Sequence, residues 1–285
     1  MTSPSIVCRP FGPYEIRDVL GKGASATVYV GRRSDGTDVA VKVLSVFAMG
    51  NADFRRAVPR EFNAVSRISH PGVITMHKMG TIADVLFIEM EMIEGPTLDA
   101  IQTVGKPLEL AAAVSTVSKA ADALQACHDS GVVHRDIKPS NILMRGDDPV
   151  LFDFGLAQDA EDPDAEPGRL YATPMTASPE QVLADGVVDG RADVYALGVT
   201  FFRLVTGKLP FYGERMDLLR LHVESPAPAP SSVNKALPPE FDAIVDKALQ
   251  KDPDDRFASA SEFAAALRSI PDDALAEKKR GWRRR

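Results

Sequence analysis

Apolar and polar residues alternate with a period of two through the first third of the chain, between turn-forming residues. This pattern predicts strands over residues 14–20, 27–32, 38–44, 73–79 and 85–92. Ser34-Asp35-Gly36 lies between the second and third of these, and we expect a hairpin there because Asp-Gly tolerates the positive φ of a tight turn. Residues 53–69 favour a helix, with Pro59 as a first turn or a break. The N-terminal part should therefore be a small antiparallel sheet with one helix.

The pattern changes after Gly95-Pro96, where stretches rich in Ala, Leu and Val begin. Residues 107–130 predict a long helix that ends at Ser130-Gly131, since glycine can take the left-handed cap. Shorter helices are predicted near 178–184, 191–206, 214–223, 240–250 and 261–269. The run from Pro226 to Pro230 is typical of a stiff surface connection. The expected fold class is α+β, with a β-rich N-lobe at 14–92, a hinge at about 91–95 and a larger helical C-lobe at 96–270.

The overall charge of −7 argues against a general nucleic-acid binder, and we predict no nucleic-acid partner. The charge is uneven, because residues 271–285 form a basic tail whose last ten residues carry six Lys and Arg against Glu277. Residues 1–13 are predicted to be a flexible lead-in without the features of a signal peptide. Cys8 and Cys127 are too few and too far apart for a disulfide framework, and no stretch has the apolar length of a membrane span, so we expect a cytoplasmic protein.

The most informative chemistry lies at residues 134–141, which read His-Arg-Asp-Ile-Lys-Pro-Ser-Asn, and at Asp153-Phe154-Gly155, seventeen residues after Asp136. Asp136 is a candidate base, Lys138 a cation for phosphate, and Asn141 and Asp153 are hard oxygen ligands of the kind that Mg²⁺ prefers. Phosphoryl transfer needs such a set, because its catalysis is mostly positioning and neutralisation of charge. A charged loop after a helix is the competing interpretation, and the whole motif makes it the weaker one.

Two weaker motifs precede this one. Gly21-Lys22-Gly23 lies between two predicted strands, where glycine lets the backbone approach phosphates, although two glycines in a hairpin are more often only a turn. Lys42 ends the apolar strand Val39-Ala40-Val41, and a lysine there is usually a surface residue. Glu61 follows nineteen residues later on the predicted helix and supplies an acidic partner, which favours the functional interpretation.

Taken together, these motifs resemble the eukaryotic-type serine/threonine protein kinase family over about residues 14–270. The sequence at residues 122–143 and 240–267 is similar to bacterial members of this family. The resemblance implies a bilobal protein-kinase-like fold and an enzyme that transfers the γ-phosphate of ATP to Ser or Thr of protein substrates, and also to itself. It implies ATP and Mg²⁺ as cofactors, with Mn²⁺ as a substitute. Asp136 would take the proton of the attacking hydroxyl, and Thr173 would contact Asp136 and Lys138.

The resemblance also assigns binding residues. Lys42 and Glu61 would hold the α- and β-phosphates, and Asn141 and Asp153 would bind the metal. The nucleotide-binding positions that it implies are Leu20, Gly21, Lys22, Gly23, Val28, Ala40, Lys42, Met90, Glu91, Met92 and Leu143. Glu180, in Ser178-Pro179-Glu180, would pair with Arg256, and Asp193 would brace the catalytic loop.

The chain departs from the family pattern at Ala26, Ala172 and Thr176, which favours low activity or unusual substrate choice. It also has no Ser or Thr between Asp153 and Thr173, where many members carry an activating phosphate. One hypothesis is that a loop carboxylate replaces this phosphate beside Arg135; a solvated acidic loop is an equal alternative. The candidate carboxylates are Asp159, Glu161, Asp162, Asp164 and Glu166.

Two other functions stay open. One is a pseudokinase that serves as an ATP-binding scaffold, and the other is a kinase-like small-molecule phosphotransferase; Thr173-Pro174 together with Ser178-Pro179-Glu180 favours a protein substrate. Besides protein substrates, a regulatory partner protein is expected. For the tail around Trp282, the sequence leaves open a solvated end, an anionic membrane surface and a docking site for a partner.

Overall fold

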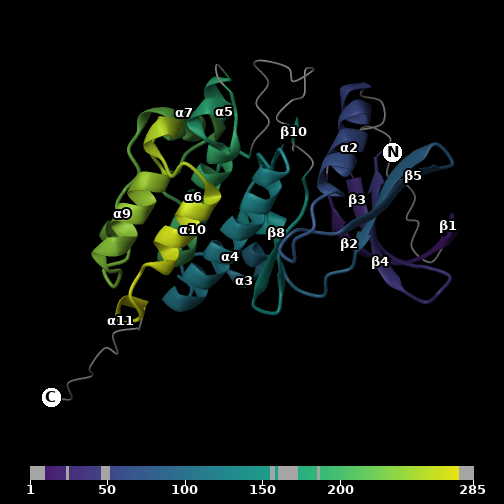
Figure 1. The fold of residues 1–285 in the computed structure, drawn as a ribbon, viewed down its shortest axis with the longest axis horizontal. Helices are drawn as coiled ribbons and strands as arrows, with labels where there is room; N and C mark the ends of the chain where they lie inside the picture. Colours follow the sequence, from purple (N-terminus) through teal and green to yellow (C-terminus); the bar gives the residue numbers. More distant parts are fainter. Residues whose placement is uncertain are drawn as a thin grey trace. The chain divides into compact units, whose positions relative to one another are not determined.

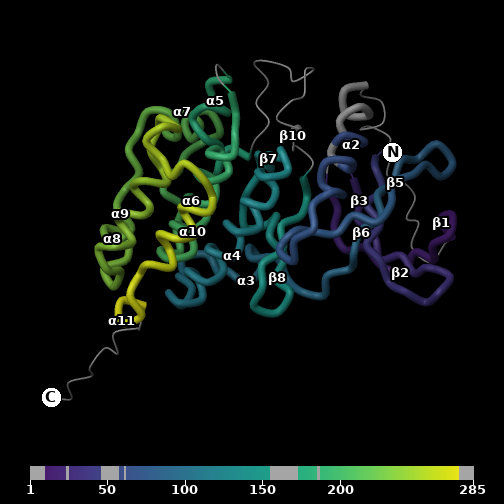
Figure 2. The backbone as a smooth tube through the Cα atoms, viewed as in Figure 1, coloured from purple at the N-terminus to yellow at the C-terminus, as the bar shows by residue number. Residues whose placement is uncertain are grey.

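The computed structural model describes residues 10–23, 26–45, 52–154, 158–159, 173–184 and 187–275, of which residues 52–57, 61, 158 and 159 are described by their backbone alone. The chain divides into two compact units, Met1–Glu94 and Gly95–Arg285. The first is the purple-to-blue part of the ribbon and tube, and the second runs from teal to yellow (Figures 1 and 2).

The first unit is an antiparallel sheet with one helix, as the alternating pattern predicts. Its strand order is β1-β2-β3-β4-β6-β5. The strands are β1 (Pro10–Phe11), β2 (Tyr14–Lys22), β3 (Ala26–Arg32), β4 (Asp38–Leu44), β5 (Met76–Ile82) and β6 (Val85–Glu91), and the helix is α2 (Ala52–Val65). The predicted hairpin turn is confirmed, because Gly36 has a φ of +86° and Asp35 Oδ1 accepts a hydrogen bond from Thr37 N at 2.9 Å.

Three expectations for this unit were wrong in detail. Pro59 lies inside α2 rather than at its first turn or a break, and the buried Val58 and Val65 show that this helix packs through one face on both sides of the proline. Pro10–Phe11 of the predicted lead-in pairs with β2, since Phe11 packs against the core. The fourth predicted strand begins at Met76 instead of residue 73.

The strand registers give the sheet two chemically different faces. Val28 lies opposite Lys42, and Ala40 lies opposite Met90, so these four side chains share one face. The other face carries an apolar core of Tyr14, Ile16, Tyr29, Val39, Val41 and Phe87. The alternation of the sequence therefore places the predicted nucleotide residues of β3, β4 and β6 on the face opposite this core.

The second unit is mainly helical. Its α-helices are α3 (Leu98–Ile101), α4 (Leu110–Asp129), α5 (Pro179–Leu183), α6 (Gly190–Thr206), α7 (Arg215–Glu224), α8 (Pro230–Val233), α9 (Pro239–Ala248), α10 (Ala260–Arg268) and α11 (Asp272–Leu275). Two 3₁₀ turns lie at Pro139–Asn141 and Pro253–Asp255. Short strands flank residues 134–141, which we call the catalytic loop. Strand β7 (Val132–Val133) pairs with β10 (Gln158–Asp159), and β8 (Ile142–Arg145) pairs with β9 (Asp148–Leu151).

Helix α6 is the central element of this unit and is buried along almost its whole length. It contacts α4, α9 and α10 (Figure 1). Asp189 caps its start by accepting a hydrogen bond from Arg191 N, and Gly207 ends it with a φ of +73°. Helix α4 ends at Ser130-Gly131 as expected, with Gly131 at a φ of +77°. None of the helices in the described ranges is long and apolar enough to cross a membrane.

The proline-rich run was predicted as a surface connection, and part of it is built into the fold. Pro230 is buried and begins α8, and Ala227 to Pro230 line a cavity of about 310 Å³ together with residues of α9. A proline fits the first turn of a helix because its missing N–H would have no partner there.

Candidate active site

Asp136 is the centre of a closed hydrogen-bond cluster between β7 and β8. Its Oδ1 accepts from the Thr173 hydroxyl at 2.6 Å and from Thr173 N at 3.2 Å. Its Oδ2 accepts from Lys138 Nζ at 2.6 Å and from Asn141 Nδ2 at 3.0 Å. Lys138 Nζ also donates to the Thr173 hydroxyl oxygen at 2.7 Å. The fold thus brings a carboxylate, an ammonium group, an amide and a hydroxyl together, although Thr173 is distant in sequence.

Asn141 is oriented so that its amide oxygen is left for another ligand. Its Nδ2 donates to the main-chain oxygen of Asp136 at 2.9 Å as well as to the carboxylate, whereas its Oδ1 accepts no hydrogen bond from the residues that the structure describes. An amide oxygen is a suitable ligand for a hard cation. The orientation of Asn141 therefore fits the metal role that the sequence suggests.

Asp153 follows β9 and has a φ of +59°, an uncommon backbone conformation for a residue other than glycine. The Phe152 N–H donates to Asn141 O at 3.1 Å, which joins the two segments that carry the predicted metal ligands. The described residues contain no group of three or more His, Cys, Asp or Glu side chains placed to hold a metal. A magnesium ion held by Asn141 and Asp153 would complete its ligands with phosphate oxygens and water.

Asp193 of α6 holds the main chain of the catalytic loop. Its side chain is fully buried; Oδ1 accepts from Arg135 N at 2.7 Å, and Oδ2 accepts from His134 N at 2.9 Å and lies 2.8 Å from His128 Nε2. Burial alone would raise the pKa of Asp193, but the hydrogen bond from His128 and the neighbouring groups lower it below its usual value. Arg135 has a φ of +64°, so these bonds fix a strained backbone beside Asp136.

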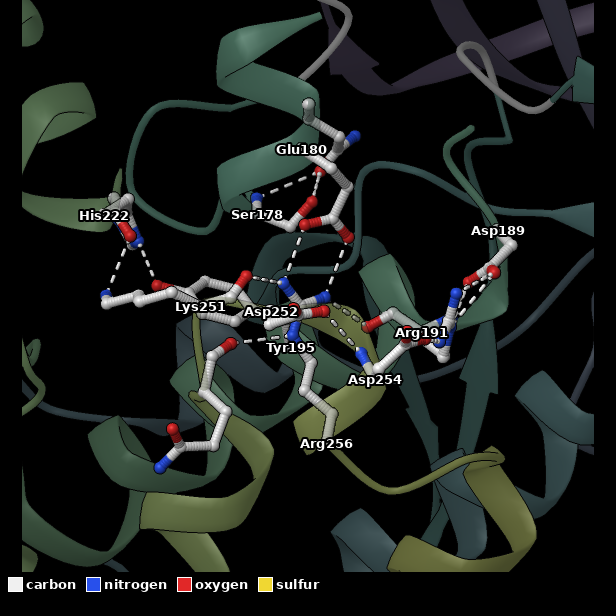
Figure 3. Close-up of polar contacts among 12 residues, drawn as sticks. Ser178, Glu180, Asp189, Arg191, Tyr195, His222, Lys251, Asp252, Asp254 and Arg256 are labelled. Carbon is white, nitrogen blue, oxygen red and sulfur yellow. Dashed lines mark hydrogen bonds and ion pairs between the residues drawn. The ribbon is translucent and has the colours of Figure 1, made fainter. Parts of the chain in front are cut away.

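A buried ion pair anchors the far end of the segment that begins at Thr173. Arg256 donates from Nη1 and Nη2 to the two carboxylate oxygens of Glu180, each at 2.7 Å (Figure 3). Its remaining donors reach three main-chain oxygens, of Gln250, Arg191 and Lys251, at 2.8, 3.1 and 2.9 Å. The Arg256 side chain is completely buried and that of Glu180 is 9% exposed, so this pair is part of the core.

The predicted nucleotide-binding residues of the first unit lie on four of its strands. One face of the sheet carries Val28, Ala40, Lys42 and Met90. Strand β6 ends at Glu91, and the exposed end of β2 is formed by Leu20 to Lys22. A Cβ atom built on Gly21 would meet no described atom within 4 Å, so packing does not require a glycine there. The open space fits the close approach of a phosphate.

A protein kinase domain is the family model that matches this chain, over residues 14–267. The chain belongs to the protein kinase family. Its relatives include the serine/threonine-protein kinase Pkn1 of Myxococcus xanthus, which is 39% identical over 265 residues that cover 90% of this chain and 38% of Pkn1. PknD of Mycobacterium tuberculosis is 37% identical over 261 residues, or 90% of this chain and 39% of PknD. The chain spans about two fifths of the length of these curated relatives.

The kinase fold agrees with solved structures. The crystal structure of the Mycobacterium tuberculosis PknI kinase domain matches with a TM-score of 0.72 and 28% identity, and the match covers 94% of this chain and 99% of that one. The α+β fold class and the resemblance to bacterial serine/threonine kinases are therefore confirmed.

Other predicted kinase residues have definite places. Leu143 lies in β8 of the second unit and bridges to Thr97, and Met92 follows β6. Gly23 N donates to Ala26 O at 2.8 Å, so Ala26, where the family has a glycine, closes the end of the β2–β3 pair. Thr176 is buried, and its N–H donates to Thr173 O at 3.0 Å.

Several predictions lie outside the described residues. Glu61 is in α2, but its side chain is not described, so the pair with Lys42 stays a prediction. The same holds for Ala172 and for residues 276–285 of the basic tail, whose first residues form α11. It also holds for the acidic residues proposed to replace a phosphate: Asp159, whose backbone alone is described, and Glu161, Asp162, Asp164 and Glu166.

Sequence reasoning missed two residues that support the loop. His128 binds Asp193, and Gly190 makes room for it, because a Cβ there would lie 2.5 Å from His128 Nδ1. Gln181 donates to Arg135 O at 2.9 Å and links the segment after Thr173 to the catalytic loop. The sequence did contain a signal for His128, because this residue is a single histidine at the end of an apolar helix.

Proposed function

We propose that this kinase transfers the γ-phosphate of ATP to serine and threonine hydroxyls of protein substrates, and also to its own. The observation that carries the proposal is the cluster in which Asp136 accepts from Lys138, Asn141 and Thr173. It gathers a base, a phosphate-binding cation and a metal ligand with the threonine that begins the substrate segment, which we define as residues 173–184. A scaffold that only binds ATP would have no need of this set.

In the proposed reaction, Asp136 receives the substrate hydroxyl proton while the hydroxyl oxygen forms a bond to the γ-phosphorus. The bond between that phosphorus and the bridging oxygen breaks, and ADP leaves with the electron pair. Lys138 Nζ, which lies 2.6 Å from Asp136 Oδ2, moves to the transferring phosphate and frees one acceptor position on that oxygen for the substrate hydroxyl, while Asn141 keeps the other. Thr173 keeps Oδ1 occupied and so orients the carboxylate.

The bound Mg²⁺, or Mn²⁺ in its place, would neutralise charge on the phosphates, with Asn141 and Asp153 as its protein ligands. Lys42 with Glu61 would hold the α- and β-phosphates from the first unit. The nucleotide-binding residues proposed in the first unit are Leu20 to Gly23, Val28, Ala40 and Met90 to Met92, and the one proposed in the second unit is Leu143. The open space at Gly21 and the shared face of Val28, Ala40 and Lys42 support this assignment.

The wider biological setting is also proposed. The catalytic domain spans 14–270 and acts in the cytoplasm, and its activity is set by a partner protein. For the basic tail at 271–285 the same three alternatives stay open: a solvated end, an anionic membrane surface, for which six Lys and Arg residues and Trp282 are suitable, and a docking site for a partner.

The test is phosphate transfer by the purified chain with Mg-ATP, to itself and to dephosphorylated casein, with sites mapped by mass spectrometry. Asp136→Asn should lower the rate by roughly 10²–10⁴-fold, because it removes the base and keeps the shape. Asp148→Asn, a matched removal of a carboxylate that is 68% exposed, should leave the rate unchanged.

Equal rates for wild type and Asp136→Asn would refute the assignment of the base. If both proteins bind ATP, measured as a thermal shift, and neither transfers phosphate, the pseudokinase replaces the proposed enzyme. Labelling of a small alcohol but not of casein would instead favour a small-molecule phosphotransferase.

A further inference from the structure

The carbonyl oxygen of Arg135 is held by a side chain of the substrate segment. Gln181, in α5, donates from Nε2 to this oxygen at 2.9 Å. The carbonyl belongs to the peptide group whose nitrogen is that of Asp136, so its orientation also determines where the backbone of the candidate base points. The side chain of Gln181 is buried, with 6% of the residue exposed, so water has little access to this contact.

The orientation of the Gln181 amide follows from its other contacts. Its Oε1 accepts from Ser178 N at 3.1 Å and from the Ser178 hydroxyl at 3.1 Å. A main-chain N–H can only donate, and a carbonyl oxygen can only accept. The amide oxygen therefore belongs on the side of Ser178 and the NH₂ group on the side of Arg135, which makes the contact with the catalytic loop a hydrogen bond instead of a contact between two acceptors.

Helix α5 is a rigid support for this contact. It begins at Pro179, directly after the fully buried Ser178. Glu180 binds Arg256 through both carboxylate oxygens, each at 2.7 Å (Figure 3). Gln181 is the next residue, so a buried ion pair one position away fixes the backbone from which its side chain reaches the catalytic loop.

Arg135 needs support on both sides because its backbone is strained, with a φ of +64°. Its φ and ψ together set the orientation of the peptide group after it relative to the peptide group before it. Asp193 holds the first of these groups, since its Oδ1 accepts from Arg135 N at 2.7 Å. Gln181 holds the second group through its carbonyl oxygen. Loss of Gln181 therefore allows the strained conformation to relax by rotation of the peptide group that leads into Asp136.

We propose that Gln181 is a positioning residue, which holds the peptide group between Arg135 and Asp136 and so places the Asp136 carboxylate for phosphate transfer. The inference rests on the proposed function, since it assigns a role in the same reaction. The substrate segment meets the catalytic loop at two points. Thr173 orients the carboxylate by donating to its Oδ1 at 2.6 Å, and Gln181 orients the backbone that carries it. The effect should therefore fall on the rate of transfer and spare the binding of ATP.

The first measurement is hydrogen–deuterium exchange of the whole chain, read at the catalytic loop by mass spectrometry. Gln181→Glu keeps the shape and the acceptor contacts with Ser178, but a carboxylate cannot donate to Arg135 O. Gln181→Met removes both kinds of contact without introducing a charge. Both variants should speed exchange in the catalytic loop by roughly three- to tenfold, the effect of losing one hydrogen bond. Ser178→Ala, which removes one of the donors that orient the amide, should give a smaller change in the same direction.

The second measurement is steady-state kinetics with casein and Mg-ATP, with rates expressed per mole of folded protein. Gln181→Glu and Gln181→Met should both lower kcat by roughly 10–100-fold, since a small misplacement of a catalytic group has an effect of this size. KM for ATP should be unchanged, because the contact lies on the side of the protein substrate.

The matched control is Gln125→Glu, the same substitution at another glutamine that bridges two segments. Gln125 accepts from Ser261 N at 3.1 Å and donates to Asp129 at 2.7 Å, and none of these residues belongs to the catalytic loop or the substrate segment. This variant should keep the exchange of the catalytic loop and kcat at their wild-type values.

Exchange in the catalytic loop that is unchanged in both Gln181→Glu and Gln181→Met would overturn the inference. So would a Gln181→Glu variant with the kcat of the wild type, because the acceptor contacts with Ser178 would then be sufficient without donation to Arg135. Exchange does not require phosphate transfer. A wild-type chain without activity would therefore refute the proposed function, while the exchange result still decides whether Gln181 holds the catalytic loop.

Discussion

Substitution of Arg256 tests how much one buried ion pair contributes to the stability of the second unit. All five of its N–H groups donate, two to Glu180 and three to main-chain oxygens, and its side chain has no exposed surface. Arg256→Met keeps much of the apolar volume but removes every donor. It leaves the Glu180 carboxylate buried without its cation.

The magnitude follows from that burial. Breaking a buried pair by removing one partner costs about 3–5 kcal/mol, because the remaining charge is uncompensated. A whole domain is stable by only about 5–15 kcal/mol, so this loss is a large fraction of the total. At about 2–4 °C per kcal/mol for a unit of this size, the melting temperature should fall by roughly 6–20 °C. Arg256→Lys should lose nearly as much, because an ammonium group cannot span both oxygens of Glu180.

The assay is urea and thermal denaturation of the full chain, followed by circular dichroism. Asp254→Asn is the matched control, because it removes an ion pair with Arg191 in the same region whose carboxylate is 83% exposed. That exposed pair should be worth about 0–1 kcal/mol. Replacing both partners, with Glu180→Leu and Arg256→Met together, should cost less than the sum of the single changes.

Two results would refute this reasoning. One is an Arg256→Met variant as stable as Asp254→Asn, which would mean that water reaches the pair. The other is strict additivity of Glu180→Leu and Arg256→Met, which would mean that the two side chains do not interact.

Three further predictions concern the catalytic loop and its support. Thr173→Val should lower the rate of casein phosphorylation by roughly 10–100-fold, and Thr173→Ser should keep it, because the hydroxyl that orients Asp136 is retained. Asp193→Asn should lower stability in urea by about 2–5 kcal/mol, because an amide cannot accept from all three donors. Burial and Lys251 lower the pKa of His222 from 6.5 to about 4. Between pH 4 and pH 6.5 this histidine is therefore protonated in the unfolded chain and neutral in the folded chain. Stability should therefore fall by up to about 3 kcal/mol as the pH drops from 6.5 to 4, and His222→Gln should flatten this part of the profile measured by urea titrations.

Much of the fold could be read from the sequence because its longer elements have clear periods. The alternation around Val39 to Val43 gave β4 its bounds, and the Ala-rich pattern gave α4 to within a few residues. Elements of two to four residues, such as β1 and α8, are too short to show a period. Their existence depends on contacts, as Phe11 on the core of the first sheet shows.

The candidate site was predictable further than its residue types, because the family resemblance also named contacts. The contact of Thr173 with Asp136 and Lys138, and the pair of Glu180 with Arg256, are present in the folded chain. His128 and Gln181 were missed, because the role of each is visible only when its partner, Asp193 or Arg135, is placed beside it.

The hydrogen bonds of Asp193 explain how the fold maintains the strained backbone next to Asp136. A non-glycine residue at positive φ costs about 1–3 kcal/mol, and Arg135 has this conformation next to Asp136. The charged acceptor Asp193 binds the N–H groups of Arg135 and His134, and each such bond contributes about 1.5–3 kcal/mol. Together the two bonds equal or exceed the strain, and they come from α6, the most buried helix of the unit. Loss of Asp193 should therefore release the loop and lower the rate of phosphate transfer under conditions in which most of the chain is still folded.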